Sequence, residues 1–597
     1  MWAFKMLDAS GKIYPGFFNG NFHLFGDYDE CLDIEQAVTE RNIKGQYCTL
    51  RVSTHYKPLG FTKSVIKSKE LEEYLSKLEF REVSTEKEHS VLLWGVCVPK
   101  SCSLESVQNF ARHFMDTLGV SGDVSVEEDL CFYQGKPLKT THLENFSYYF
   151  FVVTISLTIA STTYDAYLRL TGQTPNVFVV FSAYTNFERL LSQRPNNHNT
   201  LTCLNGIKVI SSTWVVLGHT VLFYRFIAKN VHYIYDEWNH QAFHTFMWSG
   251  HYSFDTFLTI SGFLTSYIYL KHTEVFSVDL VTFYLIRYIR LTPALVAAVL
   301  VHTTMLKFLA NGPYGLFIAN YVANHCGTTW WSPFFFVLKI MDFKRCALHL
   351  GYLAIDNQLY IFAPLILFNI KKSTTKVMKG MVFAFIISVT YSVIVTQTKG
   401  VGFTVFEWSD DFQNYLYFST LHRMPCWLLG LIFGYLFYYK KFKPSRKLNL
   451  LLWVISLGVM LKLVTGQTVF ISTEYSLHRS VLWNALARPL WSLCICFIIY
   501  SCGVGNGGVV NTFLSHAVFR VLSKLTYSVY LVHFTVLLYY FGNQKEALQF
   551  GTIEILFKFI GLFVLVLATS VILYLGFEAP IVSLKDQQEE KSATKNI

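Results

Sequence analysis

The sequence GIKVISSTWVVLGHT, from Gly206 to Thr220, has the composition of a membrane-spanning helix, yet it carries Lys208 near its start and His219 near its end. His219 follows Lys208 by eleven residues, which is about three turns of an α-helix, so the two side chains lie on nearly one face, roughly 16 Å apart along the axis. That distance is too long for a direct contact. The stretch therefore predicts a membrane helix whose polar face contacts another group between Lys208 and His219.

The composition of the whole chain is that of a membrane protein. Of its 597 residues, 52% are apolar, 17% aromatic and 15% charged, which is too apolar for a soluble enzyme of this size. From Phe146 to beyond Ile553, about eleven apolar segments recur, each near the ~20 residues that a bilayer requires. We expect an all-α polytopic membrane protein with about eleven transmembrane helices. The net charge of +10 fits orientation in the lipid bilayer better than nucleic-acid binding, because no basic stripe interleaved with stacking aromatics is present.

Composition changes along the chain indicate five regions. Residues 1–143 have ordinary polarity, with short β-like runs such as SVLLWGVCVP (90–99) and a helix that begins after Ser103, so we expect a separate α+β domain. The first transmembrane helix is expected at 144–168, a cytosolic linker at 169–200, the main membrane domain at 201–580 and a cytosolic tail at 581–597.

Basic loops indicate the orientation of the chain in the membrane. If residues 1–143 are extracellular or lumenal, the loops KKSTTKVMK (from Lys371) and YKKFKPSRK (from Tyr439) are cytosolic, in agreement with the positive-inside rule. With this orientation, the number of expected membrane spans places the C-terminus in the cytosol. The tail does not distinguish the plasma membrane from an endomembrane.

Cysteines provide an independent check of this orientation, since disulfides form in oxidising compartments. Cys326 and Cys346 share one external loop, and the first domain contains five cysteines, so one of the five has no partner within it. A zinc site at Cys97 and Cys102 lacks a second ligand pair, and we expect no metal. We predict disulfides at the following positions, with the connectivity inside the first domain left open: Cys31, Cys48, Cys97, Cys102, Cys326 and Cys346.

Ionisable residues inside a membrane are costly and usually face a cavity or a partner. In the expected orientation, six polar side chains from six spans come out at similar depths, about 10 Å inside the outer face by the helical rise. They are His219, Asp255, Asp356, Arg423, Arg488 and His533. A structural alternative is that Asp356 and Arg423 simply neutralise each other.

A second group of charges lies toward the cytosolic end. Lys208 opens its span, and Arg287 and Arg290 lie on one face of another. Three cations near one level predict an anion site suited to a polyphosphate. For Lys208 the alternative is a topology signal that reaches the lipid headgroups.

These residues resemble a known family. LNGIKVISSTWVVLGHT is similar to the Arg/Lys-x10-His motif of the membrane-bound acyltransferase-3 family, and SFDTFLTISGFL (Ser253 to Leu264), RYIRLTPAL (Arg287 to Leu295) and LTYSVYLVHF (Leu525 to Phe534) resemble its later blocks. WAFKMLDASGKIYPGFFNGNFHLFGDYDECL (from Trp2), CALHLGYLAIDNQLYIFAPLIL, LHRMPCWLLGLIFGY and CGVGNGGVVNTFLS resemble the nose resistant to fluoxetine (drop dead-like) subgroup.

The resemblance implies ten core spans plus one that carries an outer domain. It also implies a signal peptide and further domain sequence before the position of Met1. Lys208 replaces the commoner arginine of the motif, and Asn205 stands where the wider family often has Asp.

The implied activity is acyl transfer from acyl-CoA, as co-substrate, to a hydroxyl-bearing acceptor in the lipid bilayer, with no bound cofactor. Lys208, Arg287 and Arg290 would hold the CoA phosphates, and His219 would be the general base. Asp255 or Asp356 would orient its imidazole, while Arg423, Arg488 or His533 would bind the acceptor or the oxyanion. The alternatives are a membrane carrier for lipids or hydrophobic small molecules, and an interaction protein that uses the first domain.

Overall fold

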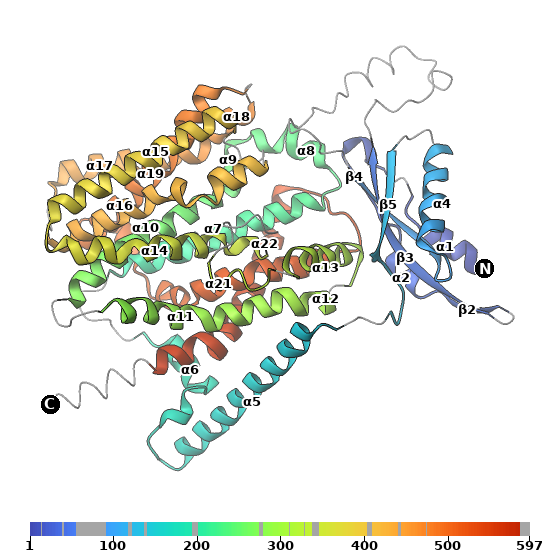
Figure 1. Cartoon of the computed structure of the whole chain (residues 1–597), viewed down its shortest axis with the longest axis horizontal. Coiled ribbons are helices and arrows are strands. Elements are labelled where there is room, and N and C mark those ends of the chain that lie inside the picture. The colour runs from blue at the N-terminus through green and yellow to red at the C-terminus, as the bar shows by residue number, and fades with distance from the viewer. Residues whose placement is uncertain are drawn as a thin grey trace.

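A computed structural model describes residues 1–597 apart from 13–14, 39–40, 55–90, 118–121, 137–139, 194–200, 274–278, 310, 328, 337–345, 403–408, 440–442, 473–474 and 585–597. The end of the expected linker and most of the expected tail therefore lie outside the described residues. Figure 1 shows an N-terminal α+β domain attached to one end of a long helical bundle.

The N-terminal domain is built on a five-stranded sheet. The strand order is β1-β4-β3-β2, and β5 pairs with the part of β3 that extends beyond β2. All pairs are antiparallel except β1 with β4. The elements are α1 (Trp2–Ala9), β1 (His23–Leu24), α2 (Tyr28–Leu32), β2 (Glu35–Val38), β3 (Arg41–Thr54), β4 (Val91–Pro99), α4 (Leu104–Thr117) and β5 (Gly122–Phe132).

Helix α4 begins where the sequence predicts it. The Ser103 hydroxyl accepts a hydrogen bond from the backbone N–H of Ser106, 3.2 Å away, which is a typical N-cap contact. Val107, Ala111 and Met115 are buried and pack on the sheet. The helix therefore covers one side of the domain with a single apolar face.

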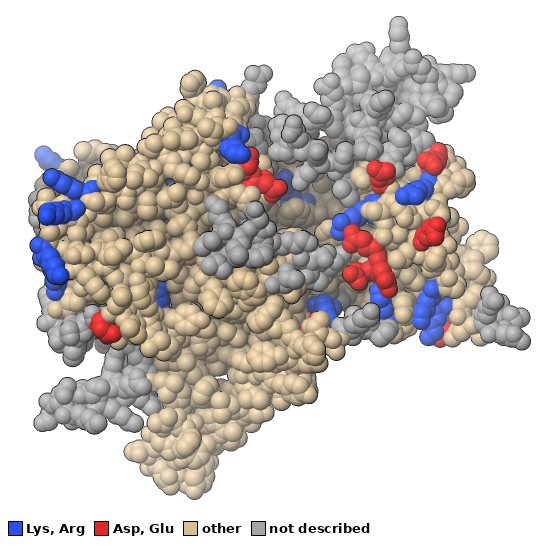
Figure 2. Space-filling view, viewed as in Figure 1, with Lys and Arg blue, Asp and Glu red and all other residues tan. Residues whose placement is uncertain are grey.

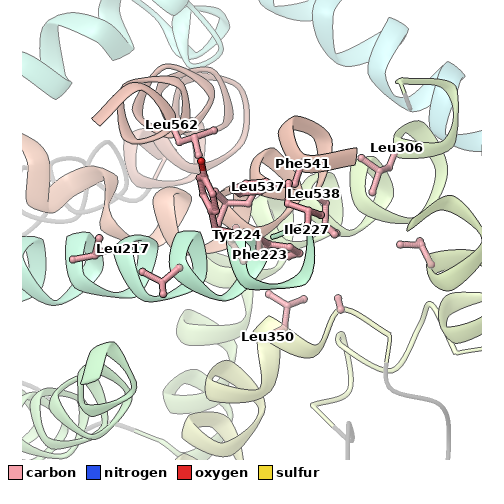
Figure 3. Packing of buried hydrophobic residues seen from close by; sticks show 14 of the residues in the cluster. Leu217, Phe223, Tyr224, Ile227, Leu306, Leu350, Leu537, Leu538, Phe541 and Leu562 are labelled. Atoms are coloured by element: carbon pink, nitrogen blue, oxygen red, sulfur yellow. The ribbon is translucent and has the colours of Figure 1, made fainter. Parts of the chain in front are cut away.

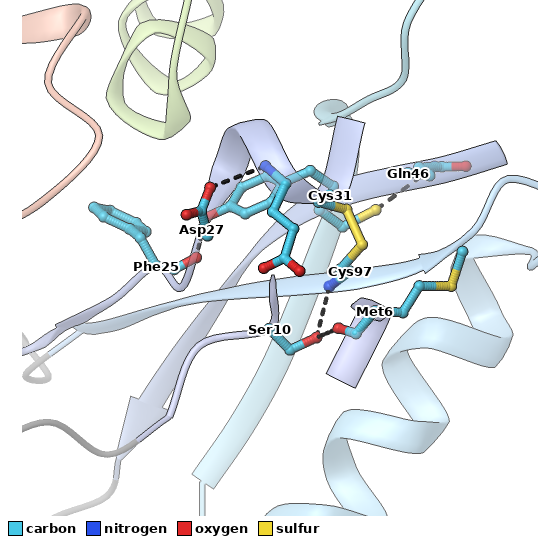
Figure 4. The surroundings of a disulfide bond; sticks show 10 residues. Met6, Ser10, Phe25, Asp27, Cys31, Gln46 and Cys97 are labelled. Atoms are coloured by element: carbon cyan, nitrogen blue, oxygen red, sulfur yellow. Dashed lines mark hydrogen bonds between the residues drawn. A yellow bond between two sulfur atoms is a disulfide. The ribbon is translucent and has the colours of Figure 1, made fainter. Parts of the chain in front are cut away.

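Two disulfides hold this domain together. Cys31 of α2 is bonded to Cys97 of β4, and Cys48 is bonded to Cys131, its direct neighbour across β3 and β5. Figure 4 shows the first bridge, beside which the Ser10 hydroxyl accepts a hydrogen bond from the backbone N–H of Cys97. The predicted participation of Cys102 is wrong: it lies before α4 as a free thiol, and Cys131 takes the place assigned to it.

In the part of the chain that the structure describes, eleven long helices form the bundle: α5 (His142–Leu170), α7 (Cys203–Phe226), α10 (Tyr252–His272), α11 (Leu280–Leu300), α14 (Gly351–Ile370), α15 (Thr374–Lys399), α16 (Thr420–Tyr439), α17 (Arg446–Thr465), α19 (Leu477–Gly503), α21 (Ala517–Gly542) and α22 (Thr552–Leu573). Within the described residues, nine of these helices are long and apolar enough to cross a membrane. The other two, α10 and α16, are of similar length but more polar, and they carry Asp255 and Arg423. The chain is a polytopic membrane protein, as expected.

Shorter helices connect the long ones: α6 (Ala183–Leu191), α8 (Val231–Asp236), α9 (Ala242–Trp248), α12 (Leu306–Leu309), α13 (Pro313–Cys326), α18 (Gln467–Ser472) and α20 (Gly508–Leu514). Helix α5 extends from the N-terminal domain along the outside of the bundle (Figure 1). The predicted bridge between Cys326 and Cys346 is confirmed and ties the end of α13 to the segment that leads into α14.

Glycines let α10 and α16 approach closely. A Cβ on Gly262 would lie 2.2 Å from the Trp427 carbonyl oxygen, and one on Gly430 would lie 2.2 Å from that of Thr259. Small residues at such crossings allow the backbones to meet. This contact fixes the rotation of both helices and therefore the direction of their polar side chains.

Helix α7 is the centre of the largest apolar core. Phe223, Tyr224 and Ile227 at its end pack against Leu537 and Phe541 of α21 (Figure 3). Helix α7 is thus held on the side that faces α21.

The N-terminal domain rests on the same end of α7. His23 interacts with the backbone of Phe226, the last residue of the helix, and its ring lies 5.4 Å from that of Tyr314 in α13. A Cβ on Gly20, whose φ is +94°, would lie 2.9 Å from Val231, so this contact requires glycine. Burial lowers the pKa of His23 from 6.5 to about 4, opposed by its backbone contact.

Candidate active site

The polar residues inside the bundle form separate groups. The sequence places six of them at one depth, but the structure divides them among different helix faces. The first group surrounds His219, the second surrounds Asp255, and Asp356 belongs to a third with Arg287.

His219 of α7 contacts another predicted residue, His533 of α21. Nε2 of His533 lies 3.1 Å from Nδ1 of His219. Nδ1 of His533 lies 2.7 Å from the carbonyl oxygen of Tyr530 and 3.2 Å from that of Val529. The His533 side chain is fully buried, whereas that of His219 is partly accessible. The ring of His219 also interacts with the backbone of Val215, one turn earlier in α7, and no hydrogen bond joins its Nε2 to the described residues.

Two further histidines complete this group and were not predicted. His349 lies in the 3-10 turn η6 (Leu348–Leu350), with its ring 5.8 Å from that of His533. His302 lies in the π-helical turn η5 (Val301–Met305), and its Nδ1 is 3.0 Å from the Thr535 hydroxyl. The sequence signal that could have identified both histidines is that each is an ionisable residue within an apolar segment. Among the residues that the structure describes, no set of three or more His, Cys, Asp or Glu could hold a metal ion.

Asp255 is bound by two arginines and does not orient His219. Arg423 donates to one carboxylate oxygen at 2.6 Å, and Arg488 donates to the other at 2.9 Å. All three side chains are buried. Trp214 of α7 faces this side of the bundle, where its ring lies 5.8 Å from that of Trp491. His219 is five residues further on, about 140° around the helix.

The Asp255 group extends to a neutral histidine. Arg488 also donates from Nε to Nε2 of His422, 2.8 Å away, so Nδ1 of His422 donates to the Ser392 hydroxyl at 2.7 Å. Two guanidinium groups thus share one carboxylate. Arg423 is in addition 4.0 Å from the centre of the Phe254 ring, which stabilises its charge. These contacts leave no role for Arg423 and Arg488 beside His219.

Asp356 pairs with Arg287, which corrects two expectations. Arg287 donates to the Asp356 carboxylate and, from Nε, to the Asn357 side chain at 2.9 Å. The pair excludes the alternative ion pair between Asp356 and Arg423, and it engages the guanidinium that was expected to bind phosphate. Asp356 therefore lies at the level of Arg287, below the histidines.

Lys208 and Arg290 remain as the cations of the expected anion site. They lie within electrostatic range of each other. Lys208 is half-buried, Arg290 is exposed, and neither has an ion pair within the described chain. Glu578 is within electrostatic range of Arg290 and accepts a hydrogen bond from the Ser528 hydroxyl at 2.9 Å. This carboxylate was not predicted.

A buried polar residue lies on the face of α7 between Lys208 and His219. Ser212 lies one turn above Lys208 on that face, and its buried hydroxyl has no hydrogen-bond partner in the described chain. Buried polar atoms are normally paired, so an unpaired one requires an explanation. An extended chain with amide groups would supply the missing partner.

Comparison with known proteins assigns both parts of the chain. Residues 1–111 match the family described as the nose resistant-to-fluoxetine protein, N-terminal domain, and residues 201–575 match the family described as the acyltransferase domain of acyltransferase-3. No solved structure matches the chain.

Individual relatives agree with these matches. The chain is 25% identical over 92% of its length to the nose resistant to fluoxetine protein 6 of Caenorhabditis elegans, of which it covers 74%. It is 24% identical over 51% of its length to the O-acetyltransferase OatA of Staphylococcus aureus (strain NCTC 8325 / PS 47). It spans 49% of that bacterial relative.

Proposed function

Because the chain belongs to the acyltransferase-3 family, we propose that this membrane protein moves an acyl group from acyl-CoA to a hydroxyl group on a lipid, glycan or other small acceptor, with His219 as the general base. The observation that carries the proposal is the position of His219: it is partly accessible within an apolar bundle, and its Nε2 has no partner in the described chain. A neutral imidazole with a free lone pair is suited to accept a proton from a hydroxyl group.

The donor would bind along α7. Lys208 and Arg290 attract the CoA phosphates, while Arg287 holds Asp356 in place. The pantetheine arm then spans the roughly 16 Å from Lys208 to His219. Its amide groups pass Ser212, whose hydroxyl offers them a hydrogen bond. In this arrangement the helix sets the distance between the phosphates and the thioester.

The reaction is an acyl transfer in two steps. As the acceptor oxygen attacks the thioester carbonyl, its proton moves to Nε2 of His219. The tetrahedral intermediate collapses with cleavage of the C–S bond. The leaving CoA thiolate takes the proton from the imidazolium, which returns His219 to its neutral form.

Charge distribution supports an orientation for the protein. Figure 2 shows Lys and Arg gathered at the end of the bundle away from the N-terminal domain. Exposed basic residues at the starts of α15 and α17 include Lys379, Arg446 and Lys447. By the positive-inside rule, we place this end and the C-terminus in the cytosol and the disulfide-bonded domain outside or in a lumen, in the plasma membrane or an endomembrane.

The central test compares purified wild type with His219→Ala. Labelled acetyl-CoA is incubated with each protein and a lipid and glycan extract, and labelled products are separated. Loss of a general base should lower turnover about 10²- to 10⁴-fold. The matched control is His478→Ala, which removes an exposed histidine of α19 and should act as wild type. Equal transfer by folded His219→Ala protein contradicts the proposal.

A second comparison tests the donor site. Lys208→Ala should raise KM for acyl-CoA about tenfold, or about 1.4 kcal/mol, with a smaller effect on kcat. Lys447→Ala removes an exposed lysine near the same end and serves as control. Equal KM values for both variants would assign Lys208 to topology alone.

The alternative function, a carrier for lipids or hydrophobic small molecules, predicts a different result. Transport needs no CoA thioester. Uptake of a labelled lipid into vesicles without acyl-CoA, undiminished in His219→Ala, would support the carrier.

A further inference from the structure

We infer that His533 is a positioning residue that sets the tautomer of His219 and so leaves the lone pair of His219 on Nε2. The inference deepens the proposed function and rests on it. It begins with the Nδ1 atom of His533, which lies 2.7 Å from the carbonyl oxygen of Tyr530 and 3.2 Å from that of Val529. Carbonyl oxygens only accept hydrogen bonds, so Nδ1 of His533 carries a hydrogen.

The hydrogen on Nδ1 of His533 in turn determines the tautomer of His219. In a neutral imidazole, one nitrogen donates and the other accepts, so Nε2 of His533 is an acceptor. That atom lies 3.1 Å from Nδ1 of His219, which must then be the donor. His219 consequently carries its hydrogen on Nδ1 and its lone pair on Nε2. The two carbonyls of α21 thus favour Nε2 of His219 as the base, in the same sense as the backbone of Val215, with which His219 also interacts.

The surroundings favour a neutral His533. Its side chain is fully buried in the bundle, where an isolated charge is costly. The ionisable rings of His349 in η6 and Tyr530 in α21 lie beside His533, and His302 of η5 lies beside His349. No carboxylate in the described chain contacts either imidazole, since Asp255 and Asp356 are held by arginines.

The arrangement differs from a histidine oriented by a carboxylate. When His219 takes the acceptor proton, its Nδ1–H continues to donate to His533, so the imidazolium keeps one hydrogen bond. Protonation of His533 itself would turn Nε2 into a donor and oppose the Nδ1–H of His219. The acid limb of the pH–rate profile therefore belongs to the pair and not to one residue.

Two substitutions separate positioning from packing. His533→Gln places an amide oxygen near the position of Nε2 and keeps an acceptor for His219. His533→Phe keeps a ring of similar shape but removes the acceptor. We expect His533→Phe to lower kcat about 10²-fold or more with KM for acyl-CoA nearly unchanged. His533→Gln should restore most of this loss, and its acid limb should become that of a single group.

A second readout does not depend on activity. In protein labelled with ¹⁵N in the histidine rings, nitrogen chemical shifts distinguish the protonated from the unprotonated ring atom, and His219→Ala identifies the signals of His219. The expected state is Nδ1–H with bare Nε2 in wild type and in His533→Gln, and a weaker preference in His533→Phe, in which the backbone of Val215 remains as a partner of His219. This measurement remains available if His533→Phe is unstable, because wild type alone reports the tautomer.

The outcomes are distinct. Wild-type protein with the hydrogen on Nε2 of His219, or equal kcat losses in folded His533→Phe and His533→Gln, overturns the inference. Wild-type activity in His533→Phe does the same. Full activity of His219→Ala instead refutes the proposed function, while the nitrogen shifts still decide the tautomer.

Discussion

Lowering the pH from 7 to 5 should weaken the contact between the N-terminal domain and the membrane bundle through His23. Burial against the end of α7 lowers the pKa of His23 from 6.5 to about 4, so the docked state disfavours the charged ring. The undocked state binds more protons between these values, and stability therefore falls as the pH drops below 6.5 and stops falling below about 4. Between pH 7 and pH 5 the loss is about 1.8 kcal/mol, which corresponds to about 20-fold more frequent opening.

Hydrogen exchange of the detergent-purified protein measures this opening. Peptides from β1 and α8 are compared in wild type and His23→Gln, each at pH 7 and pH 5, so that the packing change common to both pH values cancels. Wild type should lose about 20-fold in protection between the two pH values relative to the glutamine variant. His113→Gln, an exposed histidine of α4, controls for histidines elsewhere. Identical pH dependence in wild type and His23→Gln would refute the reasoning.

Three further outcomes follow from the packing. Gly262→Val should destabilise the protein by roughly 1–3 kcal/mol in thermal unfolding, because its side chain meets the Trp427 carbonyl, whereas Gly458→Ala, which faces open space, should not. Asp255→Asn leaves two buried guanidiniums without a carboxylate and should cost about 3–5 kcal/mol or prevent folding; a wild-type melting temperature would contradict this. A membrane-impermeant maleimide should label the N-terminal domain of the native protein at Cys102, and Cys102→Ser should abolish that label.

The sequence predicts the long helices well, because their length and apolarity are local properties. The location of His219 and His533 inside the bundle also follows from the sequence, since each is an ionisable residue in an apolar segment. Their contact does not, because depth along a span says nothing about the direction that a side chain faces. Asp255 illustrates the point: the glycine contact between α10 and α16 turns it toward Arg423 and away from α7.

The cysteine assignment failed for a related reason. The spacing of the cysteines in the sequence cannot show whether Cys102 or Cys131 forms a disulfide, because the choice depends on strand register. Once β5 pairs with β3, Cys131 lies directly across from Cys48, and the bridge follows. The sequence also does not show that Arg287 pairs with Asp356, because the two residues lie on different helices, α11 and α14.

The bridge between Cys326 and Cys346 bears on how the protein should be handled in the laboratory. It ends three residues before His349, whose ring belongs to the histidine group. A purification buffer with a strong thiol reductant would thus release the segment that positions this ring, and an inactive preparation obtained in that way would say nothing about the chemistry of the native protein. Activity measurements should begin from protein in which this bridge has been verified by mass spectrometry.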